Sequence, residues 1–438
     1  MRLLVAAGVA VFIAAAALAA PAEAQLLGPA GPLGQVAGGM PGIGQTLERA
    51  GGDVLGRAGR FGGRTLTPGR LLAARARRLA RFIRFNSRYL EGDGAGDPVV
   101  RGEVLVLSPT PAALQAALTA GFALVRQVKL GALGLAVAIL GAPPGVSAPR
   151  ALRRLRRLDP TGAFDFNHIY FGAGAAARPA WPAGLAKQRP APGLRVGLID
   201  TGVATSLPMF AGVRSEARGF APGAPSPAAH GTATASLISG RLGGFRGAAP
   251  GASLYLADIY GTTPAGGSAE ALAEALDWMV EVGAPVINVS LVGPPNLLVG
   301  AAVRAASARG ARIVAPVGND GPAAPPAYPA SYPQVIAVIP VNGEGRVLPE
   351  AGDARHVEFA APGAGLYAAD LAGGLAPVRG SSFAAPIVAG RLARLLRREN
   401  PADAARAVAE LGREARPAGP SLGYGLLGAN LGRADGRP

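Results

Sequence analysis

Three residues with small neighbours, Asp200, His230 and Ser382, could together form a nucleophilic site. Asp200 ends an apolar run, His230 opens a stretch rich in Ala and Thr, and Ser382 lies in the segment Gly-Ser-Ser-Phe-Ala-Ala-Pro. A hydroxyl is a weak nucleophile at neutral pH unless an imidazole accepts its proton and a carboxylate orients that imidazole. These residue types therefore indicate attack by a serine on an acyl group, with the three residues in the chain order Asp, His, Ser.

Each of these residues also has an ordinary structural interpretation. Asp200 could cap a turn or the following helix, and a serine at a helix start, such as Ser382, is most often an N-cap. Ser381 is a competing nucleophile. The other two histidines are weaker candidates, because His168 lies in a separate small unit and His356 has no comparable neighbours. The three segments together are far more specific than any one of them.

The expected elements would bring the three residues to one edge of a sheet. Strand–helix–strand units with a near-continuous apolar strand predict a doubly wound, mostly parallel α/β sheet. Sites in such sheets form at the carboxyl ends of strands, where Asp200 lies, and a helix starting near Ser382 offers backbone N–H groups to an oxyanion. The expected elements are strands at 194–199, 285–291 and 311–317 and helices at 268–282, 298–309 and 382–398.

A smaller unit precedes this α/β region. Its order β-α-β-β-α-β is that of a ferredoxin-like α+β domain. Before it, residues 70–90 alternate arginines with large apolar residues, which predicts an amphipathic helix that lies on a membrane surface or packs on its own domain. The expected elements of the small unit are strands at 99–107, 123–128, 135–140 and 164–170 and helices at 111–120 and 149–158.

In the segments that contain Asp200, His230 and Ser382, the chain resembles the subtilisin-like (S8) family of serine proteases. The order Asp, His, Ser is that of the subtilisin type, and not of chymotrypsin or the α/β-hydrolases. Residues 196–202, 230–235 and 380–386 resemble the family's three signature motifs, 286–294 its substrate-binding strand and 315–321 its oxyanion segment. The similarity covers about residues 193 to 400.

The resemblance implies a role for each matching residue. Ser382 would attack the substrate carbonyl, His230 would shuttle the proton, and Asp200 would orient His230. Asn319 would donate its side-chain amide to the tetrahedral intermediate together with the backbone N–H of Ser382. The alternative for Asn319 is that it only closes a turn.

The resemblance also implies an extended binding site for substrate. The family usually has glycine where this chain has Val292, whose side chain could narrow the path of an extended substrate. The residues expected to line the primary specificity pocket imply that it accepts small or apolar side chains. Asp320, near the mouth of this pocket, could favour a basic residue in the substrate. The residues implied to bind substrate are Ser290, Leu291, Val292, Gly293, Ala315, Val317 and Gly318.

In this family a ferredoxin-like domain often acts as a folding chaperone and inhibitor that self-cleavage removes. Residues 164–170 would then leave the small unit toward the active-site cleft, with processing between about 168 and 178. The expected division is a signal peptide at 1–24, a Gly/Pro- and Arg-rich segment at 25–97, a pro-domain at 98–172, a linker at 173–192, a catalytic domain at 193–415 and an irregular tail at 416–438.

The first residues predict export to the periplasm or the extracellular space. Arg2 precedes an apolar run that ends before the small-x-small segment 22–24, which is typical of a signal peptide. The alternative is an uncleaved anchor helix. The chain has no cysteine, which excludes a cysteine nucleophile, a thiolate metal site and disulfides.

The formal net charge of +16 comes almost entirely from arginine. An anionic partner would explain it, but so would genomic bias, and no aromatic-plus-basic motif accompanies the arginines. We therefore expect no nucleic-acid partner and membrane contact only through the signal segment.

The resulting prediction is an exported serine endopeptidase that acts on proteins or peptides through an acyl-enzyme. Its own pro-domain would be an intramolecular inhibitor. No cofactor is required for the chemistry, and structural calcium is implied by the resemblance only. The alternative is a catalytically weak binding protein that keeps the fold. An α/β-hydrolase is disfavoured, because it would need Gly-x-Ser-x-Gly and the order Ser, Asp, His.

Overall fold

The computed structural model describes residues 67–176, 193–396, 401–417, 419 and 422–428 of the 438-residue chain. The expected signal peptide, the Gly- and Pro-rich stretch up to residue 66 and the linker from 177 to 192 lie outside these residues. Within the described part of the chain, no helix is both long enough and apolar enough to cross a membrane.

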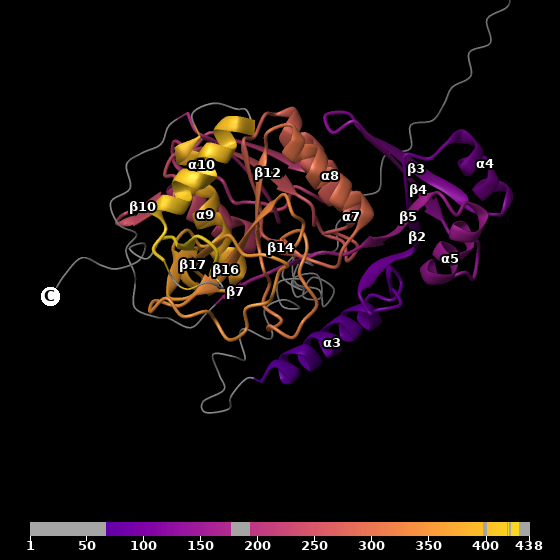
Figure 1. The fold of residues 1–438 in the computed structure, drawn as a ribbon, viewed down its shortest axis with the longest axis horizontal. Helices are drawn as coiled ribbons and strands as arrows, with labels where there is room; N and C mark the ends of the chain where they lie inside the picture. Colours follow the sequence, from indigo (N-terminus) through magenta and orange to yellow (C-terminus); the bar gives the residue numbers. More distant parts are fainter. Residues whose placement is uncertain (1–66, 177–192, 397–400, 418, 420–421, 429–438) are drawn as a thin grey trace, which may run out of the picture. The chain divides into compact units, whose positions relative to one another are not determined.

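An eight-stranded parallel sheet forms the centre of the α/β region (Figure 1), with the strand order β20-β17-β16-β15-β13-β8-β12-β9. Strand β8, which ends at Asp200, lies between β12 and β13, so its carboxyl end meets both neighbours. The strands are β8 (Arg195–Asp200), β9 (Ser215–Gly219), β12 (Ser253–Asp258), β13 (Val286–Val289), β15 (Arg312–Pro316), β16 (Val335–Val341), β17 (Phe359–Pro362) and β20 (Gly425–Leu426).

Helices cover both faces of this sheet, so neighbouring residues of one strand enter different cores. Ile313 packs with α7 and α8, and the next residue, Val314, packs with α6 and α9. The doubly wound α/β prediction is therefore confirmed. The helices are α6 (Ala229–Ser239), α7 (Ala269–Glu281), α8 (Leu297–Ala308), α9 (Ser381–Leu395) and α10 (Pro401–Glu414), with a short 3-10 helix, η1 (Pro208–Phe210).

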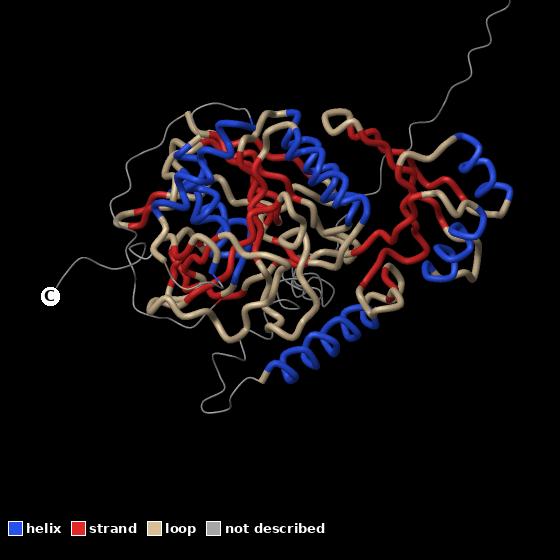
Figure 2. The backbone as a smooth tube through the Cα atoms, viewed as in Figure 1, coloured by secondary structure: helices blue, strands red, loops and turns tan. Residues whose placement is uncertain are grey.

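The small unit is a separate antiparallel sheet with the order β5-β2-β4-β3 (Figure 2), which is the ferredoxin-like arrangement. The short strand β1 pairs with the first residues of β2. The elements are β1 (Leu90–Gly92), β2 (Pro98–Leu107), α4 (Pro111–Thr119), β3 (Ala123–Leu130), β4 (Leu135–Gly141), α5 (Ala148–Leu158) and β5 (Ala163–His168).

Both faces of the strands β2 and β4 are covered, whereas most residues of β3, at the edge of this sheet, are exposed. Val104 and Leu140 pack against α5 and its neighbours in a core of their own. Their chain neighbours Leu105 and Ile139 belong instead to the core that contains α7 and α8. Strand side chains alternate between faces, so this unit buries one face against the α/β region.

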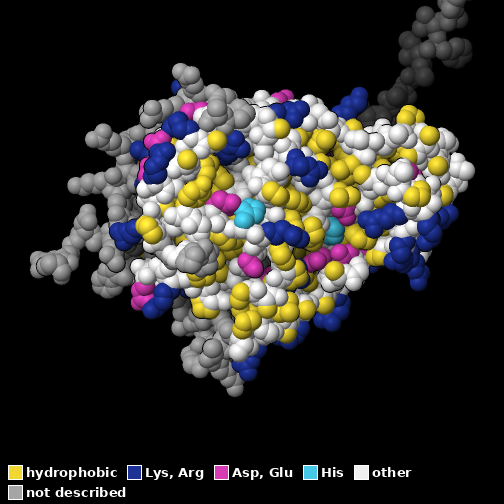
Figure 3. All heavy atoms as spheres, in the orientation of Figure 1, with side chains coloured by type: hydrophobic (Ala, Val, Ile, Leu, Met, Phe, Trp, Pro, Cys, Tyr) yellow, Lys and Arg dark blue, Asp and Glu magenta, His cyan; other side chains and the backbone are white. Residues whose placement is uncertain are grey.

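Helices α3 (Pro68–Phe85) and α5 are amphipathic and rich in arginine. The apolar side of α3, with Leu71, Leu79 and Phe82, is buried, so the helix predicted over 70–90 packs on its own protein. On the face drawn in Figure 3, Lys and Arg side chains are scattered, with a group over α5.

The remaining strands are short. They are β6 (Phe171–Gly172), β7 (Ala175–Ala176), β10 (Arg241–Leu242), β11 (Phe245–Arg246), β14 (Leu291–Val292), β18 (Leu366–Ala369) and β19 (Leu375–Arg379). The predicted strand at 285–291 is thus two strands. Strand β13 belongs to the main sheet, and β14 leaves it to pair antiparallel with β6. Likewise, the strand expected at 164–170 ends at His168.

The prediction of an irregular tail at 416–438 is wrong for the residues of β20. This strand pairs parallel with β17, and Arg416 and Leu426 exchange backbone hydrogen bonds of 3.0 and 2.8 Å. Gly425 has φ 116°, and a Cβ there would lie 2.1 Å from the Arg416 carbonyl oxygen. The glycine that made the tail look irregular is what this close pairing requires.

Candidate active site

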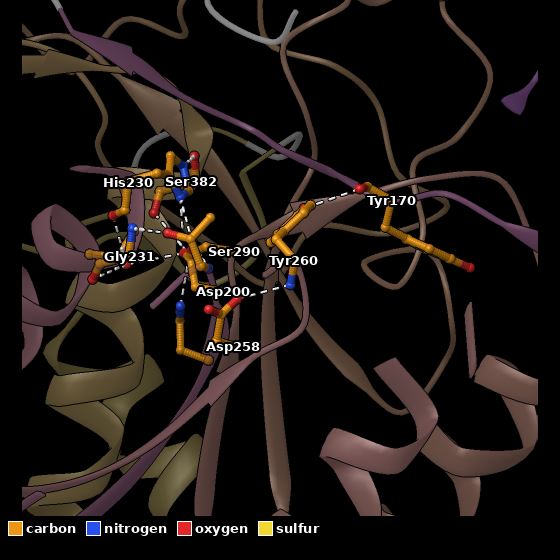
Figure 4. A network of polar contacts seen from close by, with 11 residues as sticks. Tyr170, Asp200, His230, Gly231, Asp258, Tyr260, Ser290 and Ser382 are labelled. Atoms are coloured by element: carbon orange, nitrogen blue, oxygen red, sulfur yellow. Dashed lines mark hydrogen bonds and ion pairs between the residues drawn. The ribbon is translucent and has the colours of Figure 1, made fainter. Parts of the chain in front are cut away.

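His230 lies within hydrogen-bond distance of both Asp200 and Ser382 (Figure 4). The Nε2 atom of His230 is 2.9 Å from Ser382 Oγ, and its Nδ1 atom is 2.8 and 3.0 Å from the two carboxylate oxygens of Asp200. All three residues are buried. The imidazole can therefore accept the Ser382 proton while the carboxylate holds its other nitrogen.

Backbone and hydroxyl donors fix the Asp200 carboxylate at the end of β8. The N–H of Thr201 donates to one oxygen at 2.7 Å, and the hydroxyl of Thr234 donates to the other at 3.1 Å. Helix α6 reaches this carboxylate because Gly231 lets the backbones approach closely. A Cβ on Gly231 would lie 2.2 Å from the Thr201 carbonyl oxygen.

The start of helix α9 distinguishes the two candidate nucleophiles. The N–H of Ser381 donates a 2.9 Å hydrogen bond to Asn319 Oδ1, and its buried hydroxyl has no hydrogen-bond partner among the described residues. Ser382 is the serine that contacts His230. The other two histidines contact different groups, since His168 lies near Asp93 and His356 near the Val335 carbonyl.

The carbonyl oxygen of Ala173 lies between the two expected oxyanion donors. It accepts a 2.9 Å hydrogen bond from the Ser382 N–H and a second from Asn319 Nδ2. Gly380, with φ 138°, leaves room for this segment, because a Cβ there would lie 2.8 Å from the Ala173 oxygen. The carbonyl group of the peptide bond between Ala173 and Gly174 thus lies beside Ser382 and Asn319.

The residues before Ala173 run through the site as an extended strand. Phe171 and Gly172 pair antiparallel with Val292 and Leu291, and Ile169 pairs antiparallel with Ser268 on the other side. The N–H of Ala173 lies 3.4 Å from the Ser290 oxygen. Main-chain pairing of this kind is how an extended peptide joins an exposed strand edge.

The residues after Gly174 continue along a different strand. In β7, Ala175 and Ala176 pair antiparallel with Arg379 and Val378 of β19. The segment on both sides of the Ala173–Gly174 bond is therefore held by strand pairing.

Tyr170 is fully buried and lies three residues before Ala173. Its hydroxyl donates to the Pro294 carbonyl at 2.9 Å, and its own carbonyl accepts a 3.1 Å hydrogen bond from the Tyr260 hydroxyl (Figure 4). Burial raises the pKa values of Tyr170 and Tyr260 well above the ordinary value, so both phenols stay protonated donors. A Cβ on Gly293 would lie 2.5 Å from the Tyr170 ring.

Asp258 supports the same region from the end of β12. Its carboxylate accepts hydrogen bonds of 2.7 to 3.1 Å from the backbone N–H groups of Ser226, Tyr260 and Gly261. Burial raises the pKa of Asp258, and these three hydrogen bonds oppose that shift. The carboxylate organises the loop that positions Tyr260.

The predicted substrate residues fall into two groups. Val292, Gly293, Val317 and Gly318 line a cavity of about 90 Å³ beside Ala173. The other three are placed differently. Ala315 and Leu291 are fully buried in the sheet core, and the hydroxyl of Ser290 donates a 3.0 Å hydrogen bond to the Ser382 carbonyl. The prediction that Ala315 lines the pocket does not match this position, since its side chain faces a covering helix layer.

The valine at position 292 does not prevent strand pairing, because β14 and β6 pair through it. Asp320, expected near the pocket mouth where it could favour a basic substrate residue, is paired with arginines of helix α3. Arg78 Nη2 lies 2.7 Å from one oxygen of Asp320, and Arg75 Nε lies 3.4 Å from the other. Helix α3 thus covers the mouth in this state.

Several residues of the site gave no clear signal in the sequence. Ala173 and Gly174 lie in a run of Gly and Ala that follows the last strand of the small unit, and position relative to that strand was the only clue. Phe383 follows the expected nucleophile, and its ring centroid lies 5.4 Å from that of His230. The described residues contain no cluster of three or more His, Asp and Glu side chains that could hold a metal ion.

Taken together, Asp200, His230 and Ser382 have the arrangement of a carboxylate, an imidazole and a hydroxyl that a serine nucleophile requires. The model of the subtilase family (Peptidase S8) matches residues 191–425, which are 235 of the 438 residues. The chain therefore belongs to the subtilase family.

Two relatives illustrate the similarity in sequence. Subtilisin Savinase of Lederbergia lenta is 33% identical over 215 residues, which cover 48% of this chain and 78% of that protein. M-protease of Shouchella clausii (strain KSM-K16) is 33% identical over the same length, which covers 55% of that protein. The chain thus matches little more than half the length of M-protease.

Two solved structures are similar in fold. Fervidolysin from Fervidobacterium pennivorans, described as a keratinolytic enzyme related to subtilisin, has a TM-score of 0.61 at 20% identity, covering 76% of this chain and 61% of that chain. The protease domain of PatA, solved as a mutant with one serine changed to alanine, has a TM-score of 0.51 at 26% identity, covering 56% of this chain and 96% of that one. The first likeness concerns the fold alone.

Proposed function

We propose that this protein is a serine endopeptidase that hydrolyses peptide bonds through an acyl-enzyme. The observation that supports this most strongly is the Ala173 carbonyl, which accepts hydrogen bonds from Ser382 N–H and Asn319 Nδ2 beside the Ser382–His230 pair. An internal peptide bond in that position has the geometry of a bound substrate.

In the proposed reaction, Ser382 Oγ attacks the carbonyl carbon of the scissile residue as its proton passes to His230 Nε2. Asp200 holds His230 Nδ1–H and stabilises the imidazolium that forms. The Ser382 N–H and the Asn319 amide stabilise the oxyanion. When the C–N bond breaks, His230 gives its proton to the leaving amine. Water then attacks the ester, with His230 again as base, and releases the acid and free Ser382.

We further propose that residues 98–172 are a pro-domain that inhibits the catalytic domain, 193–415, until the chain cleaves itself after Ala173. This bond lies within the expected range of 168 to 178. The contacts between the two units support the proposal. Asp165 accepts a 2.7 Å hydrogen bond from the first N–H of α8, and Phe166 O accepts one of 2.9 Å from Asn296.

Charged contacts extend this interface at the start of α7. Arg126 of the small unit pairs with Glu270, with Nε 2.6 Å from Oε1 and a second contact from Nη2. Asn167 accepts from the Glu270 N–H at 3.2 Å and donates to its carboxylate. These groups lose their partners when the two units separate, which favours their staying together until cleavage.

The proposed substrates are proteins or peptides bound as strands beside β14, and the proposed location is outside the cytoplasm. No cofactor takes part in the proposed chemistry, and calcium is expected from family resemblance only. Fractionation of cells that produce the tagged protein tests the location. The protein should lie in the periplasm or the medium, and retention of the bulk in the cytoplasm would contradict export.

Activity is tested by labelling wild type and Ser382→Ala with a serine-directed fluorophosphonate, and by measuring casein hydrolysis. The matched control is Ser381→Ala, which removes the neighbouring hydroxyl. Wild type and Ser381→Ala should be labelled and hydrolyse casein, whereas Ser382→Ala should do neither. If the wild type is neither labelled nor active after maturation, the fold serves a binding role instead.

A further inference from the structure

The residue after the proposed scissile bond, Gly174, is enclosed on the side where a side chain would project. A Cβ built on it would lie 2.4 Å from Phe383 Cε2, 2.9 Å from Phe383 Cζ and 2.6 Å from Ser382 Oγ. Its φ is not among the positive values that favour glycine. The need for glycine here therefore arises from lack of space, and not from backbone conformation.

The ring of Phe383 is the fixed obstacle. Phe383 is 2% exposed and packs in the core with α6 and α9 residues, with its centroid 5.4 Å from the His230 ring. Ser382 Oγ, by contrast, moves toward the carbonyl carbon of Ala173 when it attacks. A buried ring that touches the catalytic imidazole cannot shift without disturbing packing on both sides.

The space available for a side chain differs between Gly174 and the two residues before it. A Cβ on Gly172 would lie 3.4 to 3.5 Å from atoms of the His230 ring, which is ordinary contact for a methyl group. Ala173 lines the cavity of about 90 Å³. The position of Gly174 is thus the one among these three where even a methyl group has no room.

We propose that Phe383 restricts this protease to peptide bonds followed by glycine. The substrate class is then extended protein segments rich in small residues, with a glycine directly after the cleaved bond and space for a tyrosine at the fourth residue before it. The chain's own segment, Tyr-Phe-Gly-Ala-Gly-Ala-Ala at 170–176, has this form. The inference rests on the proposed peptidase activity and specifies its substrate.

The test compares two peptides that contain Tyr-Phe-Gly-Ala-Gly-Ala-Ala or Tyr-Phe-Gly-Ala-Ala-Ala-Ala, incubated with the mature enzyme produced from the full chain. Wild type should cleave the glycine peptide at least about tenfold faster in kcat/KM, which corresponds to about 1.4 kcal/mol. Phe383→Leu lacks the two ring atoms that block the methyl group and should reduce this ratio severalfold. Phe383→Ala, with still more space, should reduce it further.

An ester of acetyl-Tyr-Phe-Gly-Ala separates the two proposals, because it has no amino acid after the scissile bond. If the ester is hydrolysed and both peptides are cleaved equally by wild type, the role of Phe383 is wrong while the peptidase stands. An unchanged ratio in both Phe383 variants, with ester hydrolysis retained, would also overturn it. If wild type fails on the ester, the proposed peptidase activity fails first.

Self-processing gives an independent measurement in the intact chain. Gly174→Ala should slow cleavage after residue 173, and the double variant Gly174→Ala/Phe383→Leu should recover much of the rate. Restoration by the second change is not expected if Gly174→Ala acts only by disturbing folding. Equal self-processing of wild type and Gly174→Ala would contradict the inference.

Discussion

The backbone N–H of Ser382 donates a 2.9 Å hydrogen bond to the carbonyl oxygen of Ala173. These residues are more than 200 positions apart in the chain. The segment that contains Ala173 pairs with β14 before this residue and with β19 after it. The peptide bond that follows Ala173 therefore lies next to Ser382, and the proposed self-cleavage at this bond depends on that placement.

Replacing Asn319 with Leu should slow self-processing about 10²–10³-fold, a range that comes from the equivalent asparagine of a subtilisin. Asn319 Nδ2 donates to the Ala173 oxygen, so its loss leaves one donor for the developing oxyanion. The rate of appearance of the shortened chain, followed by intact mass from a synchronised refolding reaction, measures this. A rate within threefold of wild type would assign Asn319 to the turn alone.

Asp200→Asn should lower kcat on casein by about 10⁴-fold, because an amide that donates to His230 Nδ1 imposes the wrong tautomer. Thr234→Val is the matched control. It removes a single 3.1 Å hydrogen bond to the same carboxylate and should cost less than about tenfold. Similar losses in the two variants would indicate that Asp200 acts through folding and not through His230.

Arg75→Ala/Arg78→Ala should loosen helix α3 from the cleft. Both arginines pair with Asp320 over the pocket mouth, while Arg81 on the same helix is exposed. In the Ser382→Ala background, amide hydrogen exchange within residues 68–85 should become faster in the double variant. Arg81→Ala should leave it unchanged. Unaltered exchange in the double variant would show that the apolar side of α3 holds the helix by itself.

Glu274 should make stability depend on pH. Burial, and next the charge of Glu270, raise the pKa of Glu274 to about 7. Between its unfolded pKa of about 4.5 and 7, the folded state keeps a proton that the unfolded state has lost, so the free energy of unfolding falls as pH rises through this window. Above about pH 7, Glu274 is ionised in both states, and the free-energy cost of burying its charge is fully present.

The measurement for Glu274 is the melting temperature of Ser382→Ala with and without Glu274→Gln at pH 4.5 and pH 8. The neutral glutamine avoids the cost of ionisation, so Glu274→Gln should gain stability relative to its parent at pH 8 compared with pH 4.5. Glu281→Gln, on the exposed end of the same helix, is the control and should show little change. If the melting temperatures of Glu274→Gln and its parent differed by the same amount at both pH values, the raised pKa of Glu274 would be contradicted.

The sequence predicted the four longer strands of the small sheet, the strands β8, β13 and β15 at the centre of the larger sheet, and the three residues Asp200, His230 and Ser382 that lie together. It did not predict β9, β12, β17 or β20 of the larger sheet. Apolar periodicity sets strands and helices locally, and parallel strands bring their carboxyl ends, with Asp200, to one edge. Small residues beside each of the three residues allowed the close backbone approaches seen at Gly231 and Gly380.

The contacts that depend on long-range pairing were not predictable. Arg78 and Asp320 are 242 residues apart, so nothing local indicated that the carboxylate expected at the pocket mouth is already paired. The division of the strand predicted at 285–291 into β13 and β14 likewise follows from the pairing of β14 with β6. Strand β6 lies over a hundred residues earlier in the chain. Residues 172–176 are all Gly or Ala, and only the tertiary fold determines that the carbonyl of Ala173 is the one that contacts Ser382 and Asn319.

The most direct measurement is the N-terminal sequence and intact mass of the matured protein from wild type and Ser382→Ala chains. The wild type should yield a product that begins at Gly174, and Ser382→Ala should stay joined across residues 173 and 174. Cleavage of Ser382→Ala at this bond, or a wild-type product that begins elsewhere with Ala173–Gly174 intact, would contradict it.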